Sequence, residues 1–187
     1  MRARALASWA NAITCARLAL SPLMFALIPA DGQGAWPAFL LWFALCSSDA
    51  IDGYIARRRG PTVSGAFLDP LADKVLVLGA MIVLVLQDVF WVVPVAIIAA
   101  RELVISGYRI VAGGRGVSVP ASRLAKYKTL TQQLAVGFAI LPVTAVDAPW
   151  LWNGLLWAAV GLALASAAQY LRTARQPATA ASPQPVG

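Results

Sequence analysis

Six apolar runs, each long enough to cross a bilayer as a helix, dominate this sequence of 187 residues. A helix needs about 20 apolar residues to cross a hydrocarbon core of roughly 30 Å, and it satisfies its own backbone hydrogen bonds there. The sequence is 60% hydrophobic and 12% charged, which is too little charge for the surface of a water-soluble domain. It therefore predicts an all-α polytopic membrane protein with six transmembrane helices, over residues 11–29, 35–56, 67–87, 90–112, 124–143 and 150–171.

The loops between these runs divide by charge. One set contains Asp31, Asp88 and Asp147 and no Lys or Arg, whereas basic residues fill the other set and both termini. Because positive loops stay in the cytoplasm, both termini are expected to be cytoplasmic, in the plasma or inner membrane. Residues 1–176 are expected to form one membrane domain, and the Ala-, Pro- and Ser-rich tail over 177–187 is expected to be disordered.

The remaining composition excludes several kinds of site. The net charge of +7 comes mostly from residues that flank apolar runs, so it does not indicate a nucleic acid partner. Cys15 and Cys46 both lie inside apolar runs and the chain has no histidine, which argues against disulfides and zinc. Acid–base chemistry must then fall to carboxylates, lysine, tyrosine or cysteine.

Four aspartates form one pattern at the cytoplasmic ends of the second and third runs. Asp49 and Asp52 are three residues apart and Asp69 and Asp73 are four apart, so each pair shares a helix face. A short loop joins the two helices, which lets the four carboxylates converge. Neighbouring carboxylates repel one another, and one or two divalent cations would compensate. All-oxygen ligands suit Mg²⁺ or Mn²⁺, which leave coordination positions for substrate phosphates.

Small and basic residues surround these aspartates. Gly53 and Ala56 leave little bulk on the acidic helix, so a flat base or sugar could approach, and Gly65 could bring loop backbone to a phosphate. Close helix packing would equally explain such small residues. The alternative for the acids is an ion-paired network with Arg57 and Lys74, although acids in membrane helices are costly without a function.

The complete pattern resembles the signature of the CDP-alcohol phosphatidyltransferase family. It fixes eight positions: Asp49, Asp52, Gly53, Ala56, Arg57, Gly65, Asp69 and Asp73. The resemblance implies a metal-dependent enzyme, often a homodimer, that takes a CDP-linked lipid and an alcohol acceptor. It further implies that all four aspartates lie at the metal and that Asp73 is the catalytic base. The CDP-binding residues would be Asp52, Gly53, Ala56, Arg57, Gly65 and Asp69.

The second half of the chain bears on the acceptor. Arg101, Glu102 and Arg109 lie inside an apolar run, where charge is unusual without a function. The arginines are expected to meet an anionic acceptor while Glu102 holds a cation in place, since the guanidinium fork suits phosphate. A purely structural ion pair is the alternative. Lys126 and Lys128 either steer phosphate or only follow the positive-inside rule.

Further motifs resemble the phosphatidylglycerophosphate synthase branch of this family, which uses CDP-diacylglycerol and glycerol 3-phosphate. They are Asn11-x2-Thr14-x2-Arg17, Ala72-Asp73-Lys74-Val75, Arg101-Glu102-x6-Arg109 and Lys126-x-Lys128-Thr129-x2-Gln132. Ala125 departs from the pattern, because the branch usually has glycine before the lysine. Two other acceptors stay open within the family: phosphatidylglycerol, as in cardiolipin synthases, and inositol phosphate. The Arg-Glu pair favours glycerol 3-phosphate, since cardiolipin synthases tend to have Arg-Asp there.

Two other classes of membrane protein also use intramembrane acids. Membrane prenyltransferases bind magnesium diphosphate through aspartates, but they are longer and lack the frame of glycine, alanine and arginine seen here. An ion-coupled transporter would more often show an internal repeat with broken helices, and none is evident in this sequence.

Overall fold

The computed structural model describes the backbone of residues 2–59, 65–114 and 123–175, in which every regular element is a helix and no strand occurs. The all-α prediction is confirmed for this part of the chain. The tail over 177–187, predicted to be disordered, lies outside it. The helices are α1 (Arg2–Ala26), α2 (Trp36–Arg59), α3 (Gly65–Leu86), α4 (Val92–Gly114), α5 (Arg123–Ile140), α6 (Pro142–Ala145) and α7 (Pro149–Arg175).

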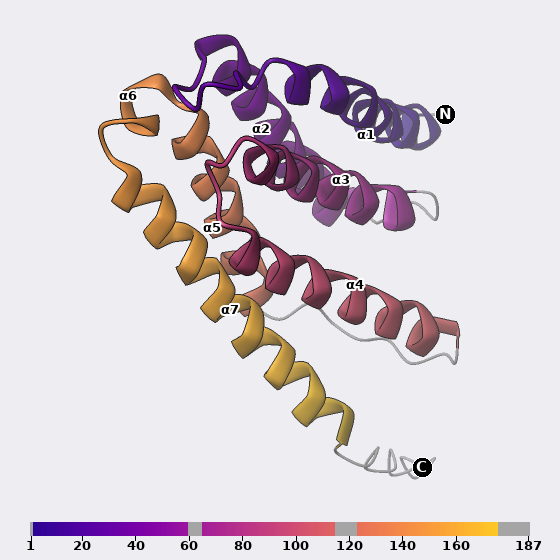
Figure 1. The fold of residues 1–187 in the computed structure, drawn as a ribbon. Helices are drawn as coiled ribbons and strands as arrows, with labels where there is room; N and C mark the ends of the chain where they lie inside the picture. Colours follow the sequence, from indigo (N-terminus) through magenta and orange to yellow (C-terminus); the bar gives the residue numbers. More distant parts are fainter. Residues whose placement is uncertain (1, 60–64, 115–122, 176–187) are drawn as a thin grey trace, which may run out of the picture.

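The long helices run alternately in opposite directions (Figure 1). The α1–α2 link, the α3–α4 link and α6 gather at one end of the molecule, while α1 and α3 begin at the other end. Within the bundle α1 packs along α3, α5 packs along α7, and α4 also contacts α7. Gly79 lets α1 approach α3, because a Cβ atom there would lie 2.3 Å from Cζ of Phe25.

Two links between helices contain residues with a positive φ angle. Asp88, in the α3–α4 turn, has φ = 59°, a left-handed conformation that aspartate adopts more readily than most residues. In the α1–α2 link, Gly34 has φ = 72°, and a Cβ atom there would lie 2.5 Å from the carbonyl oxygen of Ile140. The Ala35 N–H donates to that same oxygen at 3.0 Å, which fixes the link against the end of α5.

Two helix boundaries differ from the expectation. α1 begins at Arg2, well before residue 11, since the basic segment before the apolar run continues the helix. The run expected over 124–143 divides into α5 and the short α6. Pro142 has no N–H with which to continue α5, and the Thr144 hydroxyl donates to the Phe138 carbonyl at 2.6 Å across the break.

Polar side chains lie inside the bundle, and many large apolar side chains lie outside. The fully or nearly buried polar residues are Thr14, Arg17, Ser21, Arg101, Glu102, Lys128, Gln132 and Ser166. Leu40, Phe43, Leu86, Leu103 and Trp150 are among the exposed ones. Among the described side chains, one stretch, Pro149–Tyr170 in α7, is long and apolar enough to cross a membrane, with a mean hydropathy of 1.5. Ala12–Ala26 and Trp36–Ser48 are apolar but shorter.

Candidate active site

Asp73 lies near the start of α3, and its side chain is half-buried. The side-chain amide of Gln133, on α5, donates to Asp73 Oδ1 at 3.4 Å. Asp69 lies one turn earlier on the same helix, as the four-residue spacing predicts. Asp49 and Asp52 lie in the C-terminal half of α2. The backbone thus puts the two pairs of acids on consecutive helices at either side of a short link.

The other positions expected to bind CDP lie on these two helices. Gly53, Ala56 and Arg57 follow Asp52 in α2, and Gly65 is the first residue of α3. The side chains of α2 from Asp49 onward, and those of α3 through Pro70, lie outside the described part of the chain. The metal and CDP contacts predicted for them stay predictions.

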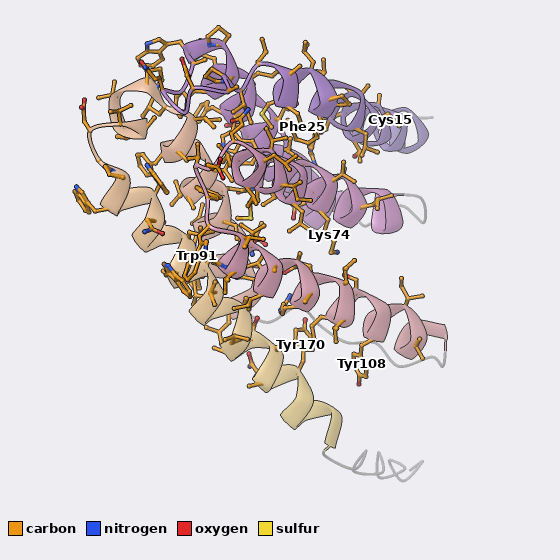
Figure 2. All side chains as sticks on the ribbon, in the orientation of Figure 1. Cys15, Phe25, Lys74, Trp91, Tyr108 and Tyr170 are labelled. Atoms are coloured by element: carbon orange, nitrogen blue, oxygen red, sulfur yellow. The ribbon has the colours of Figure 1, made fainter. Side chains whose placement is uncertain are left out.

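A polar cavity of about 150 Å³ lies beside Asp73. Four helices contribute to its wall: α3, α4, α5 and α7. The lining residues are Asp73, Lys74, Arg101, Glu102, Ile105, Ser106, Ala125, Lys128, Thr129 and Tyr170. Three of these side chains are cationic and two are carboxylates, so we refer to this cavity as the cationic pocket. Lys74 points from α3 toward α4, and Tyr170 reaches from α7 toward α4 (Figure 2).

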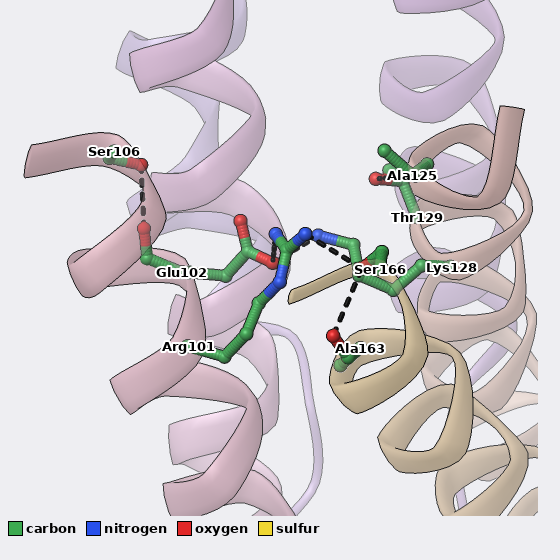
Figure 3. Close-up of polar contacts among 8 residues, drawn as sticks. All are labelled: Arg101, Glu102, Ser106, Ala125, Lys128, Thr129, Ala163 and Ser166. Carbon is green, nitrogen blue, oxygen red and sulfur yellow. Dashed lines mark hydrogen bonds and ion pairs between the residues drawn. The ribbon is translucent and has the colours of Figure 1, made fainter. Parts of the chain in front are cut away.

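Arg101, Glu102 and Lys128 form one buried ion-paired group in the wall of this pocket. Arg101 Nη1 donates to Glu102 Oε1 at 3.0 Å, and Lys128 Nζ donates to the same carboxylate oxygen. Arg101 Nη2 donates to the Ser166 hydroxyl at 2.7 Å (Figure 3). The Nε atom of Arg101 is buried and has no hydrogen-bond partner. With Lys74 and Asp73 included, the described lining of the pocket has three cations and two carboxylates, an excess of one positive charge.

The structure separates the residues that the sequence grouped as acceptor ligands. Arg101 and Lys128 both line the cationic pocket. Lys126 is exposed on another face of α5 and does not line it. The side chain of Arg109 lies outside the described part of the chain, although its backbone continues α4. Two residues on a helix are about 200° apart when their spacing is two, so Lys126 and Lys128 cannot share a face.

Apart from Thr129, which belongs to a motif noted in the sequence, several pocket and neighbouring side chains carried no clear signal in the sequence. Ser166 and Tyr170 come from α7, an apolar helix whose small residues indicate only packing. Ser106 and Thr129 each donate a hydroxyl proton to a carbonyl of their own helix, at 2.6 and 3.3 Å. Their oxygen lone pairs are then the groups that can accept a further hydrogen bond. Polarity within apolar runs was the available signal, but it gave no indication of which helices would meet.

A second cavity, of about 340 Å³, lies between α2 and α5. Its wall is mostly apolar, and we call it the apolar groove. The lining residues are Phe39, Trp42, Phe43, Cys46, Ser47, Leu130, Gln133, Leu134, Gly137 and Phe138. Gln133 belongs to this wall and also donates to Asp73, which lines the cationic pocket. Asp73 and Gln133 therefore lie where the two cavities meet.

The sequence model of the CDP-alcohol phosphatidyltransferase family matches residues 7–165. The chain belongs to this family and is an enzyme of the CDP-alcohol phosphatidyltransferase class.

Its relatives point to one branch of the family. The chain is 36% identical over 177 residues to a Bacillus subtilis CDP-diacylglycerol–glycerol-3-phosphate 3-phosphatidyltransferase, covering 86% of this chain and 91% of the relative. It is 40% identical over 149 residues to a probable phosphatidylglycerophosphate synthase of Mycobacterium tuberculosis, covering 76% of this chain and 70% of the relative. A Rickettsia typhi enzyme with the same name as the first relative is 40% identical over 133 residues, covering 70% and 75% of the two chains.

Proposed function

We propose that this enzyme makes phosphatidylglycerophosphate for phospholipid biosynthesis by transferring the phosphatidyl group of CDP-diacylglycerol to glycerol 3-phosphate, with release of CMP. The observation that carries this proposal is the position of Asp73 at the meeting of an apolar groove and a cationic pocket. A lipid donor and a small anionic acceptor need opposite surroundings on either side of the reacting centre. The names of the relatives support the same pair of substrates.

The cationic pocket suits the acceptor. Arg101 and Lys128 are 8% and 4% exposed, so their charges are largely shielded from water and attract a phosphate strongly. The unpartnered Nε of Arg101 adds a donor that an anion would satisfy. Ser106 and Thr129 offer oxygen lone pairs to the hydroxyl groups of a polyol. Among the described residues of this wall, Ile105 and Ala125 are the only aliphatic ones, which disfavours phosphatidylglycerol, the acceptor of cardiolipin synthases.

The apolar groove suits the acyl part of the donor. Aromatic side chains of α2, Phe39 and Phe43 among them, form one wall, and Leu130 and Leu134 of α5 form the other. Burying an acyl chain there removes apolar surface from water, at about 25 cal/mol for each Å². Gln133 lines this groove and donates to Asp73. A diacylglycerol that occupies the groove would thus bring its phosphate toward the acids.

The four aspartates fit one or two Mg²⁺ or Mn²⁺ ions. The donor set is all oxygen, which such ions prefer, and Asp49, Asp52, Asp69 and Asp73 lie on two consecutive helices. When bound, the metal would neutralise the donor's diphosphate and make CMP a better leaving group. Gly53, Ala56, Arg57 and Gly65 would line the cytidine diphosphate beside it. Arg57 would add positive charge near the diphosphate.

Asp73 is the proposed general base. The acceptor hydroxyl gives its proton to the Asp73 carboxylate as its oxygen forms a bond to the lipid-side phosphorus. The bond from that phosphorus to the CMP oxygen breaks, and CMP leaves with the bonding electron pair. Gln133 donates to one carboxylate oxygen of Asp73. This contact helps to orient the carboxylate, and binding both substrates in adjacent cavities supplies the alignment.

The surroundings of the site support a membrane enzyme. We propose that the domain over residues 1–176 crosses the plasma or inner membrane six times, with both termini and the acids in the cytoplasm, and acts as a homodimer. Large apolar side chains such as Leu86 and Leu103 are exposed, at 78% and 69%, whereas charged ones such as Arg101 are buried. Lipid favours this arrangement, because apolar side chains can face it and charges cannot. The alternating helix directions are also those of a polytopic bundle (Figure 1).

Purified enzyme tests the reaction directly. CMP release is measured with CDP-diacylglycerol and each of three acceptors: glycerol 3-phosphate, inositol phosphate and phosphatidylglycerol. We expect release with glycerol 3-phosphate and a lipid product whose mass is that of phosphatidylglycerophosphate. Release with inositol phosphate or phosphatidylglycerol but not with glycerol 3-phosphate would overturn the acceptor. A complete absence of CMP release with all three would overturn the proposed reaction.

A further inference from the structure

Ser166 is a fully buried hydroxyl in α7, within the apolar stretch Pro149–Tyr170. Its proton is donated to the Ala163 carbonyl at 2.9 Å, one turn earlier in α7. A serine hydroxyl has a single proton, so toward Arg101 it can only accept. The Arg101 Nη2 group fills that role at 2.7 Å (Figure 3). Ser166 is therefore a fixed hydrogen-bond acceptor aimed at one guanidinium.

Arg101 is held from two directions by different helices. Glu102, its neighbour on α4, accepts from Nη1, and Ser166 of α7 accepts from Nη2. A guanidinium fork prefers a carboxylate in a bidentate pair, which would use both of its outer nitrogens on Glu102. The Ser166 contact competes with that pair, because it engages Nη2 elsewhere. Glu102 therefore engages only Nη1 of the guanidinium, and the Nε donor has no hydrogen-bond partner.

Ser166 does not itself line the cationic pocket, whereas Arg101 does. The side chain of Ser166 contacts the wall of the pocket through its hydrogen bond to Arg101. We propose that Ser166 is a positioning residue, which holds the Arg101 guanidinium in the orientation that binds the phosphate of the acceptor. The proposal rests on the function proposed above and adds a specificity element from α7, a helix that carries none of the signature acids.

The test measures the KM of each substrate in Ser166→Ala and Ser166→Cys. We expect Ser166→Ala to raise the KM for glycerol 3-phosphate about tenfold, the scale of losing one hydrogen bond to a charged group. The thiol of Ser166→Cys is a weaker acceptor of similar size, so a smaller rise is expected. The KM for CDP-diacylglycerol should stay within about twofold of wild type in both. Ser21→Ala is the matched control, because Ser21 is also fully buried and donates to a carbonyl of its own helix, at 2.8 Å.

Three results would overturn the proposal: unchanged KM values in both Ser166 variants, equal rises for both substrates, or a similar rise in Ser21→Ala. The last two would mean that Ser166 only supports packing. If Ser166→Ala does not purify as a folded protein, Ser166→Cys decides, and a wild-type KM for the acceptor then overturns the proposal. A failure of the proposed function would be seen in the wild type instead. If the wild type uses inositol phosphate, the same KM comparison is made with that acceptor.

Discussion

The apolar groove and the cationic pocket differ in nearly every physical property, yet one hydrogen bond links their walls. The groove lies between α2 and α5, has a volume of about 340 Å³ and is lined by aromatic and aliphatic side chains. The pocket involves α3, α4, α5 and α7, has a volume of about 150 Å³ and contains five ionisable acids and bases besides Tyr170. The contrast matches an enzyme whose two substrates, a lipid and a polar phosphate, have opposite solubilities. Among the described residues, α5 is the one helix that lines both cavities. Its Gln133 donates to Asp73 in the pocket wall, and we propose that the two substrates meet there.

Removing divalent metal should abolish the reaction even though both cavities stay intact. This is the largest effect that we expect. The four aspartates would hold the proposed ions, and neither cavity offers a group that could compensate for their loss. Chelation with EDTA should reduce CMP release to background, and added Mg²⁺ or Mn²⁺ should restore it. Undiminished release after chelation and dialysis would contradict a metal role for the four aspartates.

Asp73→Asn should lower kcat at least about a hundredfold, the scale of losing a general base. The KM values should change little, because asparagine is nearly the same size as aspartate and leaves the shape of both cavities unchanged. Asp88→Asn is the matched control, since Asp88 is exposed in the α3–α4 turn and asparagine tolerates its positive φ. A purified Asp73→Asn enzyme with near-normal turnover would remove Asp73 from the role of base.

Lys128→Met and Lys126→Met sharpen the comparison on the pocket side. Lys128 is buried in the cationic pocket beside Glu102, whereas Lys126 is exposed two residues earlier in α5. Loss of a charged donor to a phosphate should raise the KM for glycerol 3-phosphate at least about tenfold in Lys128→Met. The rise in Lys126→Met should be less than about twofold. Equal effects of the two substitutions would show that both lysines act only by adding positive charge near the start of α5.

Leu134→Trp tests the groove side and should have the smallest effect. Leu134 is 41% exposed in the groove wall, and a larger ring would occupy space proposed for an acyl chain. The KM for CDP-diacylglycerol should rise by about three- to tenfold, from lost apolar burial. Leu164→Trp on α7 is the control, because Leu164 is 52% exposed and lines neither cavity. A change of the same size in both variants would count against the groove as the donor's site.

The lengths of the apolar runs and the charges between them predicted the helices better than their ends. Only Gln87 and Asp88 separate the third run from the fourth in the sequence, and the structure has α3 ending at Leu86 with Asp88 in a turn conformation. The break of the fifth run at Pro142 was missed, because α6 is short and apolar and resembles a continuation of the run. Local propensity also could not show that the α1–α2 link rests on the end of α5, since that contact is tertiary.

The site shows a similar division between local and tertiary information. The pairing of Arg101 with Glu102 joins neighbours in sequence, and intramembrane charge made it visible. Lys128 joins them across 26 residues and Ser166 across 65, distances at which one sequence gives no geometry. The choice between Lys126 and Lys128 was nevertheless within reach, because helical periodicity puts them on different faces.

The most direct test of the division between the two cavities is to measure both KM values in Lys128→Met, in Leu134→Trp and in the double variant. If the donor and the acceptor occupy separate cavities, Lys128→Met raises only the KM for glycerol 3-phosphate and Leu134→Trp only that for CDP-diacylglycerol. The double variant should then show both changes at their single-variant sizes, as expected for independent sites. A single substitution that raises both KM values equally would contradict the assignment of one substrate to each side of Asp73.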